Sequence, residues 1–371
     1  MTVPTTPAPT PPQTRRSAPL RRWRSPAALA AACALIGAAC GSHHRAAAPP
    51  PTTVTTLPAP TTTSTTLPPP TAPLTGLPQP DKAQLNAVAV VVKIDNIAAA
   101  LPQTGPNQAD VVYEELVEGG LTRLAGVFQS QYPTVVGPVR SGRLTDEGIM
   151  DDLNHPVFAY SGTNGVFLPI LQAQPATALN DDNSPNEFYR TDYAASPDNL
   201  YANVVDLAAA STTHGPPPPL FSFLSSGAVF NGPGIGPVNQ VGINFPEAAI
   251  IWNWDASLHD WVRTQNGNPD VDRSGAQLSA TNVVIELIPY TTALMSSGEG
   301  GPSVPIPWGN MVGSGSAWFF SNGHVIRGTW SRSSLTSVTS YKNSAGATVE
   351  LTRGRTWVEL APVGTVPVLT P

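Results

Sequence analysis

Cysteine is nearly absent from this chain. Only two of its 371 residues are cysteines, Cys33 and Cys40, and both lie close to the N-terminus. The rest of the chain therefore can form no disulfide and offers no thiol nucleophile or thiolate metal site. A chain of this length can instead be stabilised by burying a sizeable hydrophobic core.

Charged residues are also scarce, at 12% of the sequence, and acidic residues outnumber basic ones by 25 to 19. Five arginines and no acids precede Cys40, so the part that follows has 14 basic and 25 acidic residues, a net charge of −11. This balance argues against nucleic acid as a partner, because phosphate backbones require a basic face. It also argues against broad electrostatic adhesion to anionic lipids or wall polymers, although a local arginine pocket can still hold one anion.

Several motifs of enzymes and cofactor-binding proteins are missing. The sequence has no phosphate-binding P-loop, no Gly-x-Ser-x-Gly elbow and no His-Glu-x-x-His pair. The glycines of residues 232–236 lack the spacing of a nucleotide-binding fingerprint, so we expect a loop there. Residues 151–155 read Asp-Asp-Leu-Asn-His, where a single imidazole favours a solvated helix end over a metal site. We therefore assign no catalytic residue, metal or cofactor, and favour a protein that is not an enzyme.

The N-terminal segment has the pattern of an export signal. Five arginines precede an apolar, alanine-rich run that is too short to span a membrane comfortably. Cys40 ends this run and is followed by Gly-Ser, as in a bacterial lipoprotein signal. We predict a signal peptide at residues 1–40 with Cys40 as the lipidated residue, and Cys33 remains an alternative. The mature protein is then exported and lipid-anchored at the outer face of the cytoplasmic membrane.

Composition divides the remaining chain into three parts. Residues 41–75 are dominated by Ala, Pro and Thr, which predicts a disordered, extended linker. A His-Gly pair followed by four prolines at residues 214–219 then marks a boundary. We therefore predict one domain at residues 76–213 and a second at residues 214–371.

Strand-like and helix-like segments alternate in the first domain. A continuous β-branched run at residues 88–94 predicts a strand buried on both faces. Further strands are expected at residues 109–117, 121–129 and 157–162, and helices at residues 145–153, 166–173 and 198–210. The alternation predicts an α+β or α/β domain with a mixed sheet.

The second domain consists of short β segments separated by Gly and Asn turns. Strands are expected at residues 248–254, 259–263 and 281–287, and hairpins at residues 317–327 and 336–351, the first turning at Asn322-Gly323. This pattern predicts a mostly antiparallel β domain. Tryptophans are concentrated in this domain: Trp252, Trp254, Trp261, Trp318, Trp330 and Trp357. They could stack on sugar rings, but alternating strand positions favour the core for most of them.

Short motifs of charged, glycine and aromatic residues recur along the folded part. They are Leu74-Thr75-Gly76, Lys93-Ile94-Asp95-Asn96, Gln108-Ala109-Asp110-Val111-Val112-Tyr113-Glu114, Gly119-Gly120-Leu121-Thr122-Arg123, Gly137-Pro138-Val139-Arg140-Ser141-Gly142-Arg143, Phe188-Tyr189-Arg190, Asn199-Leu200-Tyr201, Asn282-Val283-Val284, Gly328-Thr329-Trp330 and Gly354-Arg355-Thr356-Trp357-Val358. In this order they resemble the YerB-like family of bacterial surface lipoproteins, from about Leu74 to Pro362. The resemblance implies a two-domain surface protein but carries no assigned reaction.

Two positions depart from the family pattern. The family has a histidine in the strand that here reads Phe158-Ala159-Tyr160-Ser161-Gly162, and another where this chain has Asp198. Their absence argues against catalysis driven by an imidazole group in this chain.

Charged residues gather at the ends of apolar runs between residues 93 and 143, where a scaffold presents functional groups to a crevice. Arg140 and Arg143 flank Ser141 in a loop before the helix expected at residue 145. Two guanidinium forks, loop amides and a helix N-terminus suit phosphate or carboxylate. The predicted ligand-binding residues are Arg140, Arg143, Arg123, Asp95 and Glu114, with Arg190 as an alternative to Arg123.

Two other interpretations of these residues remain open. In the first, the arginines only neutralise acids in a buried ion-pair network; these acids are Asp95, Asp110, Glu114 and Glu118. In the second, the acids on one face of a strand serve acid–base chemistry or bind a divalent ion. In a strand, Asp110, Glu114 and Glu118 would share a face and Glu115 would point away.

We therefore expect a cell-envelope lipoprotein that binds an anionic or glycan-derived ligand, or a protein partner, without catalysis. It would contact the membrane only through its lipid anchor and bind no nucleic acid. One alternative is an envelope enzyme acting on a phosphorylated lipid or wall polymer, with Asp95 or Glu114 as base or metal ligand. Another is a structural assembly factor.

Overall fold

The computed structural model describes residues 69–213, 215–296 and 303–371. The predicted signal peptide, both cysteines and most of the predicted linker lie outside these residues. Within the part described, no helix is both long enough and apolar enough to cross a membrane.

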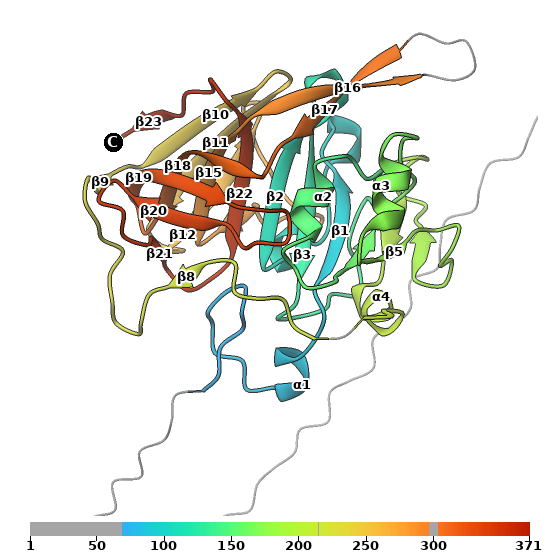
Figure 1. Ribbon diagram of the computed structural model, residues 1–371, viewed down its shortest axis with the longest axis horizontal. Coiled ribbons are helices and arrows are strands. Elements are labelled where there is room, and N and C mark those ends of the chain that lie inside the picture. The colour runs from blue at the N-terminus through green and yellow to red at the C-terminus, as the bar shows by residue number, and fades with distance from the viewer. Residues whose placement is uncertain (1–68, 214, 297–302) are drawn as a thin grey trace, which may run out of the picture. The chain divides into compact units, whose positions relative to one another are not determined.

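An eleven-stranded mixed sheet forms the centre of the fold (Figure 1). In sheet order its strands are β20 (Ser340–Asn343), β19 (His324–Arg332), β18 (Gly313–Ser321), β15 (Asn282–Ile288), β22 (Thr356–Pro362), β2 (Val111–Leu116), β3 (Thr122–Phe128), β1 (Val90–Asp95), β4 (Val157–Ala159) and β5 (Thr177–Leu179), and β9 (Gly236–Pro237) pairs with β19. Pairing is parallel for β15–β22, β22–β2, β1–β4 and β4–β5 and antiparallel elsewhere. Because β22 lies between β15 and β2, both parts of the chain contribute to one sheet.

Each face of this sheet packs against its own hydrophobic core. Side chains alternate between the two faces along a strand. In β1, Val92 and Ile94 enter one core and Val91 enters the other. All six residues of β1 are buried, as its β-branched sequence predicts.

A second, antiparallel sheet of six strands covers one face of the large sheet. Its strands are β13 (Asn268–Pro269), β12 (Asp260–Gln265), β11 (Ala248–Asp255), β10 (Gln240–Phe245) and β23 (Val368–Thr370), with β14 (Ser279–Ala280) paired to β12. Aromatic contacts join the sheets: the ring centroids of Trp252 and Trp357 are 5.1 Å apart, and those of Trp261 and Phe320 are 5.7 Å apart. These three tryptophans and Trp330 are buried, so the prediction that most belong to the core is confirmed.

The helices are short. They are α1 (Lys82–Leu85), α2 (Asp146–Met150), α3 (Phe167–Ala173) and α4 (Val204–Ala209). Ile149 of α2 and Phe167 of α3 enter the core opposite the six-stranded sheet, whereas Val204 and Leu207 of α4 enter the other core. Two-stranded pairs complete the fold: β6 (Phe188–Arg190) with β7 (Leu200–Ala202), β8 (Ser222–Phe223) with β21 (Glu350–Leu351), and β16 (Tyr290–Ser296) with β17 (Ser303–Gly309).

The predicted fold class is confirmed, since the N-terminal part has a mixed sheet with few helices and the C-terminal region is mostly antiparallel. The hairpin at Asn322-Gly323 is also confirmed, and both turn residues have positive φ. The helix expected at residues 198–210 is wrong in its first half. Leu200–Ala202 is the buried strand β7, and α4 begins only after Asn203, whose side chain caps it.

Candidate functional site

Three neighbouring strands place charged side chains in one row on the face opposite the six-stranded sheet. In register, Asp95 at the end of β1 is paired with Arg123 of β3, and Arg123 is paired with Glu115 of β2. Residues paired across strands point to the same face, so their side chains are neighbours. Lys93, two positions before Asp95, points to the same face.

A buried lysine lies beneath this row. Lys93 Nζ donates a hydrogen bond to Glu115 and lies 2.8 Å from Asp146 Oδ1 of α2, and all three side chains are fully buried. The pKa of Glu115 is raised to about 7, mainly by burial and also by the charge of Asp146, while Lys93 opposes the shift. The ammonium group thereby joins β2 to α2 under the site.

The loop of residues 136–143 continues the sheet beside β1. β4 pairs only with the first half of β1. Beyond β4, the loop takes its place through backbone hydrogen bonds, among them one from Arg140 N to Lys93 O at 2.8 Å. This pairing sets Arg140 beside Asp95, with 2.7 Å between Nε and Oδ2.

The same loop fixes Arg143 at the start of α2. Its backbone N–H donates to Asp146 Oδ2 at 2.7 Å, and its Nε lies 2.6 Å from Glu118 Oε2. Gly142 precedes it where a Cβ would lie 3.0 Å from the rings of two core phenylalanines. A side chain at Gly142 would therefore displace the loop from the sheet.

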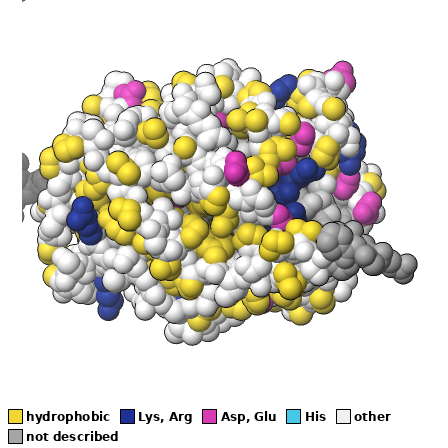
Figure 2. Space-filling view, turned by 90° about the horizontal axis from the view of Figure 1, so that it is seen from above, with side chains coloured by type: hydrophobic (Ala, Val, Ile, Leu, Met, Phe, Trp, Pro, Cys, Tyr) yellow, Lys and Arg dark blue, Asp and Glu magenta, His cyan; other side chains and the backbone are white. Residues whose placement is uncertain are grey.

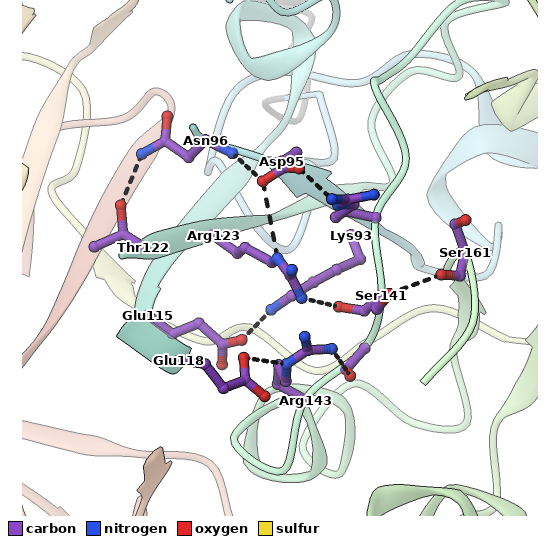
Figure 3. A network of polar contacts seen from close by, with 12 residues as sticks. Lys93, Asp95, Asn96, Glu115, Glu118, Thr122, Arg123, Ser141, Arg143 and Ser161 are labelled. Carbon is purple, nitrogen blue, oxygen red and sulfur yellow. Dashed lines mark hydrogen bonds and ion pairs between the residues drawn. The ribbon is translucent and has the colours of Figure 1, made fainter. Parts of the chain in front are cut away.

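Arg123 lies between these groups (Figure 3). Its Nη1 donates to Ser141 O at 2.9 Å, and its Nε lies 3.8 Å from Asp95 Oδ1. The pKa of Arg123 is lowered to about 10, mainly by burial and also by the charge of Arg143, while Asp95 opposes the shift. The guanidinium group is still charged at neutral pH.

Part of each guanidinium group stays unbonded by the protein. The side chains of Arg140, Arg143 and Arg123 are 23%, 13% and 12% exposed. Among the residues that the structure describes, Arg140 contacts Asp95 through Nε, and Nη2 of Arg123 and of Arg143 forms no hydrogen bond. In the view of Figure 2, charged side chains are concentrated towards the right of the molecule and are sparse elsewhere. Terminal nitrogens of Arg123, Arg140 and Arg143 are therefore left over for an anion, and we call this place the arginine site.

The structure separates Glu114 from the other four predicted site residues. Consecutive residues of β2 point to opposite faces, so Glu115 joins the arginines and Glu114 faces the six-stranded sheet. Both carboxylate oxygens of Glu114 accept hydrogen bonds from Arg263 Nη2, at 2.9 and 2.8 Å, and neither side chain is exposed. Thr122 Oγ1 also donates to Glu114 at 2.7 Å. Glu114 therefore joins the two sheets and has no access to the arginine site.

The ion-pair interpretation holds for part of the site. Arg140 pairs with Asp95 and Arg143 with Glu118. Asp110, however, accepts hydrogen bonds from the backbone after β3 instead of from these arginines. Arg190 is 46% exposed and pairs with Asp181. The arginines are thus positioned by acids, but by fewer of them than the network interpretation requires.

Sequence reasoning did not assign Asp198 to the site, although it singled the position out. Its carboxyl group lies close enough to Asp95 and Arg140 for the charges of both to affect it. Burial raises the pKa of Asp198, Arg140 opposes the shift and Asp95 adds to it. The strand with the other missing histidine also adjoins the site, because Ser161 N donates to Arg140 O at 2.9 Å. Both departures from the family pattern therefore lie beside the loop of residues 136–143, which we call the arginine loop.

No group of three or more His, Cys, Asp or Glu side chains within the described residues is arranged to hold a metal ion. The solvated helix end expected at residues 151–155 is wrong for Asp152. This side chain is buried, with Arg332 Nη2 at 3.7 Å from Oδ2. His155 has a positive φ of 59° beyond α2.

Known proteins share this architecture. The N-terminal domain of a protein of unknown function (DUF3048) matches residues 74–216, and the C-terminal domain of the same family matches residues 241–358. The chain is 27% identical over 282 residues to the putative lipoprotein YerB of Bacillus subtilis, which covers 74% of this chain and 81% of YerB. A crystal structure of YerB from Bacillus subtilis superposes with a TM-score of 0.65 at 23% identity, over 80% of this chain and 99% of that one. The chain therefore belongs to the two-domain DUF3048 family of unknown function, as its resemblance to YerB-like proteins indicates.

Proposed function

We propose that this protein is a cell-envelope lipoprotein that binds an anionic ligand through Arg140, Arg123 and Arg143, without a chemical step. The observation that carries the proposal is the unbonded part of three guanidinium groups at one place on a net-acidic protein. Guanidinium groups bind phosphate and carboxylate through paired, charge-assisted hydrogen bonds. The acids Asp95, Glu118 and Asp198 lie beside the three arginines, so the attraction for an anion comes from the unbonded guanidinium nitrogens and not from a local excess of positive charge.

Protein contacts preorganise this site for binding. Arg140 is held through Nε by Asp95, and Arg143 through Nε by Glu118, so neither has to lose much side-chain freedom when a ligand arrives. Arg123 is fixed by the carbonyl of Ser141. A purely structural role would not require the terminal nitrogens to stay unbonded.

Export and lipid anchoring are the second part of the proposal. The sequence pattern that ends at Cys40 supports a lipoprotein signal. The relative YerB is described as a putative lipoprotein. The long Pro- and Thr-rich segment after Cys40 would then hold the binding domain away from the membrane.

The alternative is an envelope enzyme that acts on a phosphorylated lipid or wall polymer. Asp95 and Asp198 favour it, because acid–base catalysis on a phosphate held by Arg140 needs carboxyl groups at this place. Glu114 cannot serve as its base, since Arg263 occupies both oxygens in the interior. Consumption of a lipid-linked phosphate by the purified protein would establish the enzyme.

Calorimetric titration of full-length protein in detergent with phosphate and pyrophosphate tests binding. The double variant Arg140→Ala, Arg143→Ala should bind about tenfold or more weakly, because each charge-assisted contact is worth about 1.5–3 kcal/mol. Arg327→Ala, which removes an exposed arginine of β19, is the matched control and should bind normally. Arg140→Lys keeps a charge for Asp95 if the double variant fails to fold. Equal affinity in all variants, or no binding of any anion, refutes the proposal.

A further inference from the structure

A pocket of about 230 Å³ adjoins the arginine site through one shared residue, Asp198. Asp198 lines the pocket, and its carboxyl group lies near Asp95 and Arg140. The backbone joins the same two places, because Val139 N in the arginine loop donates to Leu200 O of β7 at 2.7 Å. The pocket therefore lies next to the loop that carries Arg140.

The groups that line the pocket suit a ring that bears hydroxyl groups. The rings of Tyr193 and Tyr201 meet edge to face at 5.5 Å, and the Arg273 guanidinium lies over Tyr193, 3.4 Å from the ring centroid. The Tyr201 ring is buried and the guanidinium covers one face of Tyr193, so the tyrosines shape the pocket wall and do not stack on a ligand. A carboxylate accepts and a guanidinium donates hydrogen bonds to the hydroxyls of a sugar.

Both polar groups of the pocket lack partners in the protein. Asp198 Oδ1 is buried with no hydrogen-bond partner among the residues described, and Arg273 forms no ion pair with them. An alkyl chain in the pocket would leave the buried Asp198 Oδ1 unpaired, which is costly. The pocket is also smaller than the roughly 300–1,000 Å³ of sites for drug-sized molecules, so it suits a single ring.

We propose that the ligand of the arginine site is a phosphate ester of one polyhydroxylated six-membered ring. The phosphate binds Arg140, Arg123 and Arg143, and the ring occupies the adjoining pocket with its hydroxyls bonded to Asp198 and Arg273. This inference rests on the proposed function and names its ligand class. A free sugar phosphate and a membrane lipid with such a headgroup share this chemistry.

Calorimetry on the full-length protein in detergent separates these cases. Glucose 1-phosphate should bind about tenfold more tightly than inorganic phosphate, the equivalent of about one added hydrogen bond. Butyl phosphate, which has no hydroxyl groups, should bind no more tightly than phosphate. Phosphatidylinositol in mixed micelles should bind more tightly than phosphatidylglycerol if the natural source is lipid-linked.

Arg273→Ala is the decisive variant, because this side chain is exposed. It should lower the affinity for glucose 1-phosphate about fivefold to tenfold and leave inorganic phosphate binding unchanged. Arg327→Ala should change the affinity for neither ligand. Equal losses for both ligands in Arg273→Ala would show only long-range electrostatics and overturn the inference.

Two further outcomes are distinguishable. If phosphate binds at the arginines but neither glucose 1-phosphate nor phosphatidylinositol binds better than its control, the inference fails and the proposed function stands. If no phosphate compound binds at all, the proposed function fails and the inference falls with it.

Discussion

Raising the pH from 5 to 8 should destabilise this protein, because two carboxyl groups are buried near the same arginine. Asp152 lies 3.7 Å from Arg332, and Glu286 accepts a hydrogen bond from the Tyr341 hydroxyl at 2.6 Å. The pKa of each carboxyl group is raised to about 7, mainly by burial. Glu286 contributes to the rise at Asp152, and Arg332 opposes the rise at both groups. Both groups therefore hold protons in the folded state that the unfolded chain releases.

The sign and size of the effect follow from linkage. Unfolded-state pKa values of 3.8 for Asp152 and 4.5 for Glu286 lie below the folded values, so the stability is greatest at low pH and is lost as the pH rises towards 7. One pKa unit corresponds to about 1.4 kcal/mol. Between pH 5 and pH 8, the ionisation of each group then lowers the free energy of unfolding by about 2–3 kcal/mol, and the two together lower it by about 5 kcal/mol.

Urea unfolding followed by tryptophan fluorescence at both pH values measures this loss. The double variant Asp152→Asn, Glu286→Gln should lose the part of the pH dependence that these two groups contribute and keep a slope of the same sign from other buried carboxyl groups, chiefly Glu115 and Glu359. Asp255→Asn, at an exposed turn, is the control and should keep the wild-type slope. Equal stability at pH 5 and pH 8, or an unchanged slope in the double variant, would refute the reasoning.

Three further predictions concern the site and the anchor. Lys93→Met should lower the free energy of unfolding by about 3–5 kcal/mol, because it leaves two buried carboxylates without a cation; unchanged urea midpoints would contradict it. Gly142→Ala should cost about 1–3 kcal/mol through overpacking and also weaken phosphate binding, since the arginine loop must shift; calorimetry and urea unfolding check both effects. Cys40→Ala should move the protein from the membrane fraction to the soluble fraction, and an unchanged distribution on fractionation would remove the argument for a lipid anchor.

Local sequence indicated which residues carry charge at the ends of strands. Asp95 ends β1 and Arg123 lies near the start of β3, whereas Arg140 reaches Asp95 only because its loop pairs with β1. The β-branched run of β1 likewise predicted a doubly buried strand. Such patterns express backbone geometry and burial, which act over a few residues.

The remaining features of the site depend on strand register and on pairing between distant segments, which local sequence does not specify. The alternation of β2 was recognised, but which face meets the arginines was not, because that depends on the register with β3. Asp198 was placed in a helix because an acid suits a helix N-terminus, whereas tertiary pairing of the buried β7 prevailed. The partnership of Glu114 with Arg263 joins residues that are 149 positions apart and leaves no local signal.

The place of β22 between β15 and β2 has a consequence for the order of assembly. A chain that emerges from the N-terminus first presents β1, β2 and β3 with one edge of β2 still open. That edge is filled only when Thr356–Pro362 arrives near the end of the chain, so contacts of long sequence separation complete the sheet. Exposed strand edges invite intermolecular pairing. Truncation just before Thr356, which removes β22 and β23, should therefore yield a chain that aggregates instead of folding stably.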